Sequence, residues 1–384
     1  MFNFSYQNPT RIVFGKDQLS QLRKLIPTGA KVLLTYGGGS IKHNGVYQQV
    51  IDALKGFDWQ EFSGIEPNPS FETLMRAADV VRREKIDFLL AVGGGSVIDG
   101  TKFIAAAAVF EGDAWDILAK GAKITTAVPL GCVLTLPATG TESNGNSVVT
   151  RYETQQKLSF SSSLVYPTFA VLDPTVTYSL PPKQVANGVV DAFVHVMEQY
   201  MTYPVNAPVQ DRFAEGLLQT LIEEGPKALS NPQDYDVRAN VMWAATMALN
   251  GLIGQGVPQD WATHMIGHEI TALYGLDHAQ TLAIVLPSLL QQQRSSKREK
   301  LLQYGRRVWN LQHQDEERLI DEAINHTRAF FEQMGVPTRL ADYGIKADAV
   351  DKLVKALETN GMLKLGEHGD ITPDVTRQIL QRAV

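Results

Sequence analysis

Three histidines lie close together in the second half of the chain, at spacings that suit a metal ion. His264 and His268 are four residues apart, which on a helix places both imidazoles on one face. A break at Gly275-Leu276 lets the chain fold back and bring His278 toward the same point. Because Glu269 follows His268 and does not lie between the first two histidines, the HExxH arrangement of zincin proteases is absent.

A second apolar segment supplies a carboxylate and another imidazole. Asp191 and His195 are also four residues apart, within GVVDAFVHVMEQY. A mixed oxygen and nitrogen donor set suits Fe or Zn better than Ca or Mg. Any single histidine is more often a core or surface residue, but half of the eight histidines lie in these two segments. The spacing therefore predicts one shared metal site, with five candidate ligands: Asp191, His195, His264, His268 and His278.

Two units of strand, glycine turn and helix precede these segments. The apolar run 31–36 ends in GGGS at residues 37–40, and the run 88–92 ends in GGGS at residues 93–96. Such alternation predicts a parallel sheet. Backbone N–H groups at a helix start favour an anion, so one turn is expected to hold a pyrophosphate and the other an adenosine ribose. Neither turn is GxGxxG or a Walker A loop, and the alternative is a plain tight turn.

The residue pattern changes at Pro181-Pro182. Residues 1–181 are predicted to form an α/β, Rossmann-like dinucleotide-binding domain with a parallel sheet, and residues 182–384 an all-α metal-binding and catalytic domain. A break is expected at Gly225-Pro226. A cleft between tightly joined domains is a common place for a ligand. The predicted helices of the second half lie near 183–201, 206–224, 235–251, 258–274, 278–293, 296–310, 315–334, 347–358 and 372–382.

The amino-acid composition of the chain limits the classes of protein to which it can belong. The chain is 44% hydrophobic and 20% charged with a formal net charge of −6, as in ordinary globular proteins. The absence of a long Lys/Arg run argues against nucleic acid or an anionic membrane as a partner. A single cysteine, Cys132, excludes a disulfide framework and fits a reducing compartment, so a cytoplasmic location is expected.

The motifs together resemble one enzyme family over essentially the whole chain. They are GGGS, EPNPS, AVGGGSVIDGTKF, LPATGTESN, LPPKQVANGVVDAFVH and DWATHMIGHE. This combination resembles the iron-containing (group III) alcohol dehydrogenases, in the branch of NADPH-dependent aldehyde reductases and butanol dehydrogenases. The resemblance implies a metal-dependent enzyme that interconverts primary alcohols and aldehydes, and a homodimer.

The resemblance also implies which residues act. A single divalent ion, Fe2+ or Zn2+, is expected on Asp191, His195, His264 and His278. His268 is then not a ligand, and lies beside the nicotinamide and the substrate, where it is placed to relay a proton. The expected catalytic residues are thus His268, Asp191 and His264. The expected cofactor contacts are Gly37, Gly38, Gly39, Ser40, Asn68, Gly94, Gly95, Ser96, Asp99, Thr139, Thr141 and Lys157.

Two departures from the family pattern carry information. Relatives that prefer NAD have an aspartate at the end of the strand 33–36, where it would repel a 2′-phosphate. Here Tyr36 is followed only by glycines and Ser40, which favours NADP(H). The second departure is Glu142-Ser143-Asn144, where many relatives have Gly-Ser-Glu.

Other functions remain as alternatives. A polyol dehydrogenase or a dehydroquinate-synthase-like lyase would share this architecture, but a charged substrate needs an Arg/Lys cluster at the metal, and none lies near His264 or His278. A metal-dependent phosphohydrolase would use His and Asp on helices without two glycine turns. A non-catalytic nucleotide-binding protein would not need the metal set.

Overall fold

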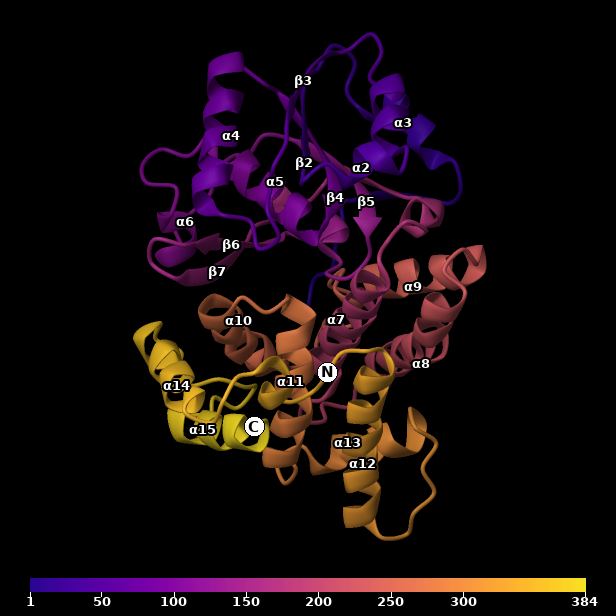
Figure 1. The fold of residues 1–384 in the computed structure, drawn as a ribbon, viewed down its shortest axis with the longest axis vertical. Coiled ribbons are helices and arrows are strands. Elements are labelled where there is room, and N and C mark those ends of the chain that lie inside the picture. Colours follow the sequence, from indigo (N-terminus) through magenta and orange to yellow (C-terminus); the bar gives the residue numbers. More distant parts are fainter. The chain divides into compact units, whose positions relative to one another are not determined.

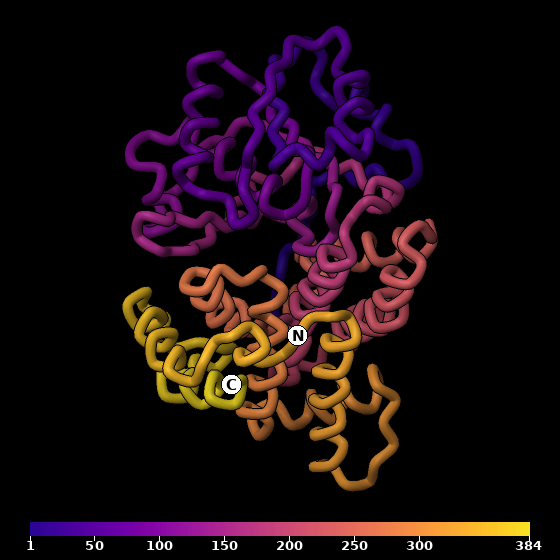
Figure 2. The backbone as a smooth tube through the Cα atoms, viewed as in Figure 1, coloured from indigo at the N-terminus to yellow at the C-terminus, as the bar shows by residue number.

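The computed structural model describes residues 1–384, and the chain forms two compact units. The α/β unit contains Gln7–Leu180 and Gln233–Thr246, and the helical unit contains Met1–Tyr6, Pro181–Pro232 and Met247–Val384. Each unit is therefore assembled from separate stretches of the chain. Both chain ends, marked N and C in Figure 2, belong to the helical unit.

The α/β unit is built on a six-stranded, entirely parallel sheet in the order β1-β8-β5-β4-β2-β3. Leaving out the edge strand β1, this is the order 2-1-3-4-5 of doubly wound folds. The inner strands are almost fully buried, as expected when helices cover both faces. The strands are β1 (Arg11–Phe14), β2 (Lys31–Tyr36), β3 (Asp58–Phe62), β4 (Phe88–Gly94), β5 (Leu130–Leu136) and β8 (Phe169–Leu172).

Alternating side chains of these strands feed two separate hydrophobic cores. Leu33 and Leu89 point to the face covered by α4 (Phe71–Glu84) and α5 (Gly95–Ala107). Leu34 and Leu90 point to the opposite face, covered by α1 (Leu22–Leu25) and α3 (Val46–Ala53). Figure 1 shows α3 on one side of the sheet and α4 with α5 on the other. The predicted parallel sheet with helices is therefore confirmed.

Two features of the α/β unit were not specified by the sequence pattern. The edge strand β3 was missed because its residues, DWQEF, are largely polar and only partly buried. The chain after β5 forms an antiparallel hairpin of β6 (Asn146–Arg151) and β7 (Gln156–Ser161), which is separate from the main sheet. Two short helices, α2 (Ser40–His43) and α6 (Asp116–Ala119), complete the unit.

The helical unit surrounds α7, which is buried along most of its length. None of the helices combines the length and apolarity that a membrane span requires. The helices of the second half of the chain are α7 (Pro182–Tyr200), α8 (Pro208–Ser230), α9 (Tyr235–Ala248), α10 (Ala262–Tyr274), α11 (His278–Gln292), α12 (Arg298–Arg307), α13 (Glu316–Gln333), α14 (Ala349–Thr359) and α15 (Pro373–Arg382). Most of α9 belongs to the α/β unit, although it lies in the helical half of the sequence.

The predicted break at Gly225-Pro226 is wrong, because α8 continues through it to Ser230. Pro226 removes one helix hydrogen bond. Gly225, however, lies so close to α7 that a Cβ there would be 2.8 Å from Val189. The packing of α8 on α7 thus keeps the chain helical where local preference favours a stop.

We expect substitution of Gly131 by alanine to destabilise the α/β unit. A Cβ at this position in β5 would lie 2.3 Å from the ring of Phe169, which stacks on Phe88 with ring centroids 5.9 Å apart. Overpacking of this kind costs about 1–3 kcal/mol, so urea unfolding followed by circular dichroism should show a lower midpoint. The control is Gly216→Ala in α8, where no atom lies within 4 Å of the added Cβ. Equal midpoints for the two variants would contradict this packing.

Candidate functional site

The helical unit brings together a carboxylate and three imidazoles. Asp191 and His195 are on α7, His264 is in the first turn of α10, and His278 is the first residue of α11. Gly275, with φ of 70°, ends α10 in the left-handed conformation and permits the reversal that returns His278 to the group. One potential ligand atom from each of the four residues lies within 4.8 Å of the others.

The geometry of this group fits a divalent ion. Nε2 of His195 lies 3.0 Å from Nε2 of His264, and Nε2 of His278 lies 3.7 Å from Oδ1 of Asp191. Nitrogen ligands at about 2.0–2.1 Å from zinc in a tetrahedral complex are ~3.3 Å apart, which is close to these separations. Asp191, His195 and His264 are buried, whereas the side chain of His278 is 24% exposed to solvent.

His268 lies beside this group. It is buried on α10, one turn after His264, and its ring centroid is 5.5 Å from that of His278 and 6.2 Å from that of His264. It does not belong to the four residues whose ligand atoms lie within 4.8 Å. Its assignment as a proton relay stays a prediction.

Glu198 is a site residue that the sequence reasoning missed. Its Oε2 is hydrogen-bonded to Nδ1 of His264, and its Oε1 accepts from the backbone N–H of His264 at 3.2 Å. Burial, together with the charge of Asp260, raises the pKa of Glu198 well above its usual range. A signal was available, because Glu198 lies three residues after His195 and seven after Asp191, on the same face of α7.

A buried ion-pair cluster lies behind Glu198. The ammonium of Lys297 is 2.8 Å from Oδ2 of Asp260 and 2.8 Å from the carboxylate of Glu367, and it donates to the carbonyl of Met201 at 2.8 Å. Although burial lowers the pKa of Lys297, the two carboxylates outweigh this effect and raise it. Its ion pairs with the two carboxylates are what allow the ammonium of Lys297 to remain buried.

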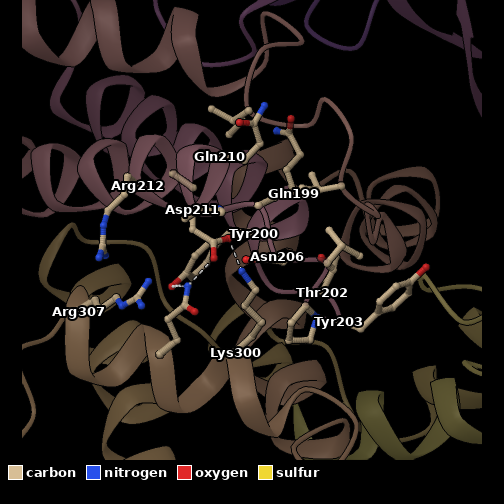
Figure 3. Close-up of a pocket in the computed structure, with 18 residues that line it drawn as sticks. Gln199, Tyr200, Thr202, Tyr203, Asn206, Gln210, Asp211, Arg212, Lys300 and Arg307 are labelled. Carbon is tan, nitrogen blue, oxygen red and sulfur yellow. Dashed lines mark hydrogen bonds and ion pairs between the residues drawn. The ribbon is translucent and has the colours of Figure 1, made fainter. Parts of the chain in front are cut away.

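A polar cavity of about 230 Å³ lies near the C-terminal end of α7 (Figure 3). Its charged groups pair with one another: Lys300 binds Asp211, and Nη1 of Arg307 lies 3.0 Å from Oε1 of Glu215. Tyr200 donates to Glu215 at 3.1 Å. None of the four clustered metal-donor residues lines this cavity, so it is separate from the candidate metal centre.

The α/β unit places both glycine turns at one edge of its sheet. β2 and β4 are parallel neighbours, so the turns that follow them lie at the same carboxyl edge. The chain passes from β2 outward to β3 and then to β4 on the other side, which makes this edge a topological switch point, where such folds bind ligands. Gly95 allows a close approach here, because a Cβ on it would lie 2.8 Å from Thr139.

Several expected cofactor residues are connected by hydrogen bonds next to the second turn. Oγ of Ser96 accepts from the backbone N–H of Asn68 at 3.3 Å, and Oδ1 of Asn68 accepts from Nζ of Lys157 at 2.9 Å. Asn68 adopts a φ of 55°, in the left-handed region that asparagine tolerates. The structure thus gathers residues from α5, β7 and the loop before α4 into one polar cluster.

Asp99 and Thr141 belong to a more deeply buried network. Oγ1 of Thr141 donates to Oδ1 of Asp99 at 2.5 Å, and the ammonium of Lys102 donates to Oγ1 of Thr141 at 2.6 Å. Burial raises the pKa of Asp99, and burial lowers the pKa of Lys102 to about 8. These contacts join the start of α5 to the loop after β5, which also carries Thr139.

Comparison with known proteins agrees with both halves of this description. The model described as iron-containing alcohol dehydrogenase matches residues 9–174, and the model of the C-terminal part of the Fe-containing alcohol dehydrogenase family matches residues 185–384. The chain is 63% identical to the NADPH-dependent aldehyde reductase YqhD of Escherichia coli, over 100% of both proteins.

Solved structures show the same fold. The substrate- and cofactor-free form of the aldehyde reductase YqhD from Escherichia coli superposes with a TM-score of 0.94 at 61% identity, over 100% of both chains. The NADH-dependent butanol dehydrogenase A of Thermotoga maritima superposes with a TM-score of 0.96 at 37% identity, over 100% of this chain and 99% of that chain. The chain described here therefore belongs to the iron-containing alcohol dehydrogenase family.

Proposed function

We propose that this protein is a metal-dependent aldehyde reductase that uses NADP(H) and interconverts primary alcohols and aldehydes. The observation that carries the proposal is the group of Asp191 with three histidines, in a chain that also has two glycine turns at a switch point of its sheet. The full-length similarity to an NADPH-dependent aldehyde reductase supports the same reaction. Aldehyde, NADPH and a proton give alcohol and NADP+.

We assign the cofactor to residues 1–181 and the metal to residues 182–384. Asp191, His195, His264 and His278 would hold Fe2+ or Zn2+, which when bound supplies a Lewis acid for the substrate oxygen. Asp191 contributes the one negative charge among the four donors. His268, one turn from His264, donates the proton that the substrate oxygen gains as the alcohol forms.

The end of β2 supports the choice of NADP(H), whose nicotinamide supplies the hydride. After Tyr36 the chain offers backbone N–H groups and the hydroxyl of Ser40, and no carboxylate occupies residues 37–40. Gly38 is exposed, and no atom lies within 4 Å of the position that a Cβ would take. This turn therefore has room for a 2′-phosphate, and residues 37–40 carry no negative charge of their own to repel it.

We further propose that the protein is a cytoplasmic homodimer formed through the β1 edge of the sheet. β1 pairs only with β8, so its other side presents free backbone groups. Large apolar side chains lie at this edge: Phe14 is 38% exposed and contacts Trp243, which is 43% exposed, with ring centroids 5.8 Å apart. A second copy would cover both. The single buried thiol of Cys132 agrees with the location.

The reaction and the metal can be tested together with butanal. The metal-loaded protein is expected to oxidise NADPH, and chelation should abolish turnover until Fe2+ or Zn2+ is restored. In His264→Ala, turnover should fall at least about 100-fold because a Lewis acid supplies several kcal/mol, while NADPH affinity measured by fluorescence should be retained. The control is His313→Ala, since His313 pairs with Glu322 away from the site. Equal loss of turnover and NADPH binding in His264→Ala would contradict separate metal and cofactor sites.

Cofactor preference can be tested at Gly38. In Gly38→Asp, the new carboxylate should repel the 2′-phosphate and raise KM for NADPH by about tenfold or more, with little change for NADH, because like charges in contact cost several kcal/mol. Steady-state kinetics with both cofactors measures the difference. Gly38→Asn has nearly the same shape without the charge and should keep the original preference. If both variants changed both KM values alike, this turn would not recognise the 2′-phosphate.

The dimer is testable by light scattering after size exclusion. The wild-type protein is expected at about twice the chain mass of 42.3 kDa. Trp243→Glu should shift it toward the monomer, because the substitution places a charge in the apolar patch. Tyr152→Glu changes another exposed aromatic residue, on the hairpin turn, and should leave the mass unchanged. A monomeric wild-type protein would rule out the dimer.

A further inference from the structure

We infer that Glu198 is the positioning residue of the metal centre: its carboxylate holds His264 in the tautomer that presents Nε2 to the ion, and it balances the charge of the ion. The inference rests on the proposed metal site. It adds a residue from outside the donor set, and it makes the affinity for the ion depend on that residue.

The contacts of Glu198 fix both the ring and the backbone of His264. Nδ1 of His264 donates to Oε2, and the backbone N–H of the same residue donates to Oε1 at 3.2 Å. A divalent ion beside it would favour the ionised form of Glu198. An ionised carboxylate only accepts hydrogen bonds, so the proton of the neutral imidazole stays on Nδ1 and Nε2 keeps its lone pair. That Nε2 lies 3.0 Å from Nε2 of His195, on the side of the donor group.

Glu198 is itself held rigidly. It lies on α7, the helix that carries Asp191 and His195, and its side chain keeps only 2% of its exposure. Its backbone carbonyl accepts from the N–H of Asp260 at 2.8 Å, and Oδ1 of Asp260 accepts from the N–H of Ala262 at 2.8 Å at the start of α10. One stretch of α7 therefore fixes the start of α10 as well as the ring of His264.

The net charge of the proposed metal centre is a second argument for the role of Glu198. A divalent ion bound by Asp191 and three neutral imidazoles would leave one positive charge in a largely buried group. Burying a charge without a partner is costly. Glu198 places a negative charge next to the centre through the imidazole that it binds, an arrangement in which the carboxylate makes the histidine a more basic ligand.

The competing explanation is that Glu198 contributes only to folding, as a buried partner of the backbone of α10. The two explanations differ in what happens to the metal. A purely structural carboxylate would affect the stability of the apoprotein, whereas a positioning carboxylate affects the affinity and the coordination of the ion.

The experiment compares metal binding by the full-length wild-type protein, Glu198→Gln and Glu269→Gln. The matched control, Glu269, is another buried carboxylate on α10, and it accepts from Asn360 at 2.7 Å. Zn2+ affinity of each apoprotein is measured by competition with a chromophoric chelator. We expect Glu198→Gln to raise Kd by about 10–100-fold, as outer-sphere substitutions do, and Glu269→Gln to leave Kd close to the wild-type value. Co2+-loaded Glu198→Gln should also show a changed visible absorption spectrum.

A folded Glu198→Gln protein with wild-type Zn2+ affinity and Co2+ spectrum would overturn the inference. Failure of the wild-type protein to bind the metal would instead overturn the proposed metal site, so the two failures are distinguishable. If Glu198→Gln does not fold, NMR of the metal-free wild-type protein with 15N-labelled histidine decides, with the His264 signals identified by their loss in His264→Gln. Protonated Nδ1 supports the inference, and protonated Nε2 overturns it.

Discussion

The helical unit is organised around a carboxylate and three imidazoles whose ligand atoms lie within 4.8 Å of one another, mostly out of contact with solvent. Concentrating polar groups in an interior is costly unless they bind one another or an ion. This constraint explains how the helices around the four side chains are arranged. α7 is buried nearly throughout, so that Asp191 and His195 face inward, and the left-handed Gly275 lets His278 return to the group. The convergence of these four side chains is thus a tertiary property of three helices.

The α/β unit is under a different constraint. The backbone N–H groups of its glycine turns have to be exposed at the ends of rigidly packed strands. The buried strands β2 and β4 form the support, and the glycine turns begin where these strands end. At Gly93 a Cβ would come within 2.6 Å of Val97, which lies in the first turn of α5. The close packing of turn against helix therefore requires glycine as much as any ligand does.

Hydrophobic periodicity was enough to predict the helices and strands that have strong residue patterns. It was not enough where tertiary packing determines the structure. The long helices of the second half begin and end near the predicted residues, and the buried strands before the glycine turns were correctly placed. β3 is short, polar and at an edge, so it carries little hydrophobic signal. Pro226 was taken for a helix stop because the contact of α8 with α7 is not local information. Spacing on α7 and α10 indicated four candidate donors, and the break at Gly275 added His278. The spacing could not say which of the five converge. Glu198 was missed for a related reason, because its relation to His264 exists only once α7 and α10 pack together.

The departure at Glu142-Ser143-Asn144 has a structural explanation that also accounts for the segment Gln233–Thr246. Oε1 of Glu142 accepts from Oγ1 of Thr246 at 2.5 Å, with both side chains buried. Oδ1 of Asn144 accepts from the ammonium of Lys102 at 3.1 Å. These bonds attach the loop after β5 to α9 on one side and to α5 on the other. Buried polar contacts of this kind are costly to leave half made, so the presence of Glu142 and the return of α9 to the α/β unit depend on each other. Glu142 and Asn144, which depart from the family pattern, are therefore the residues that hold this loop in place.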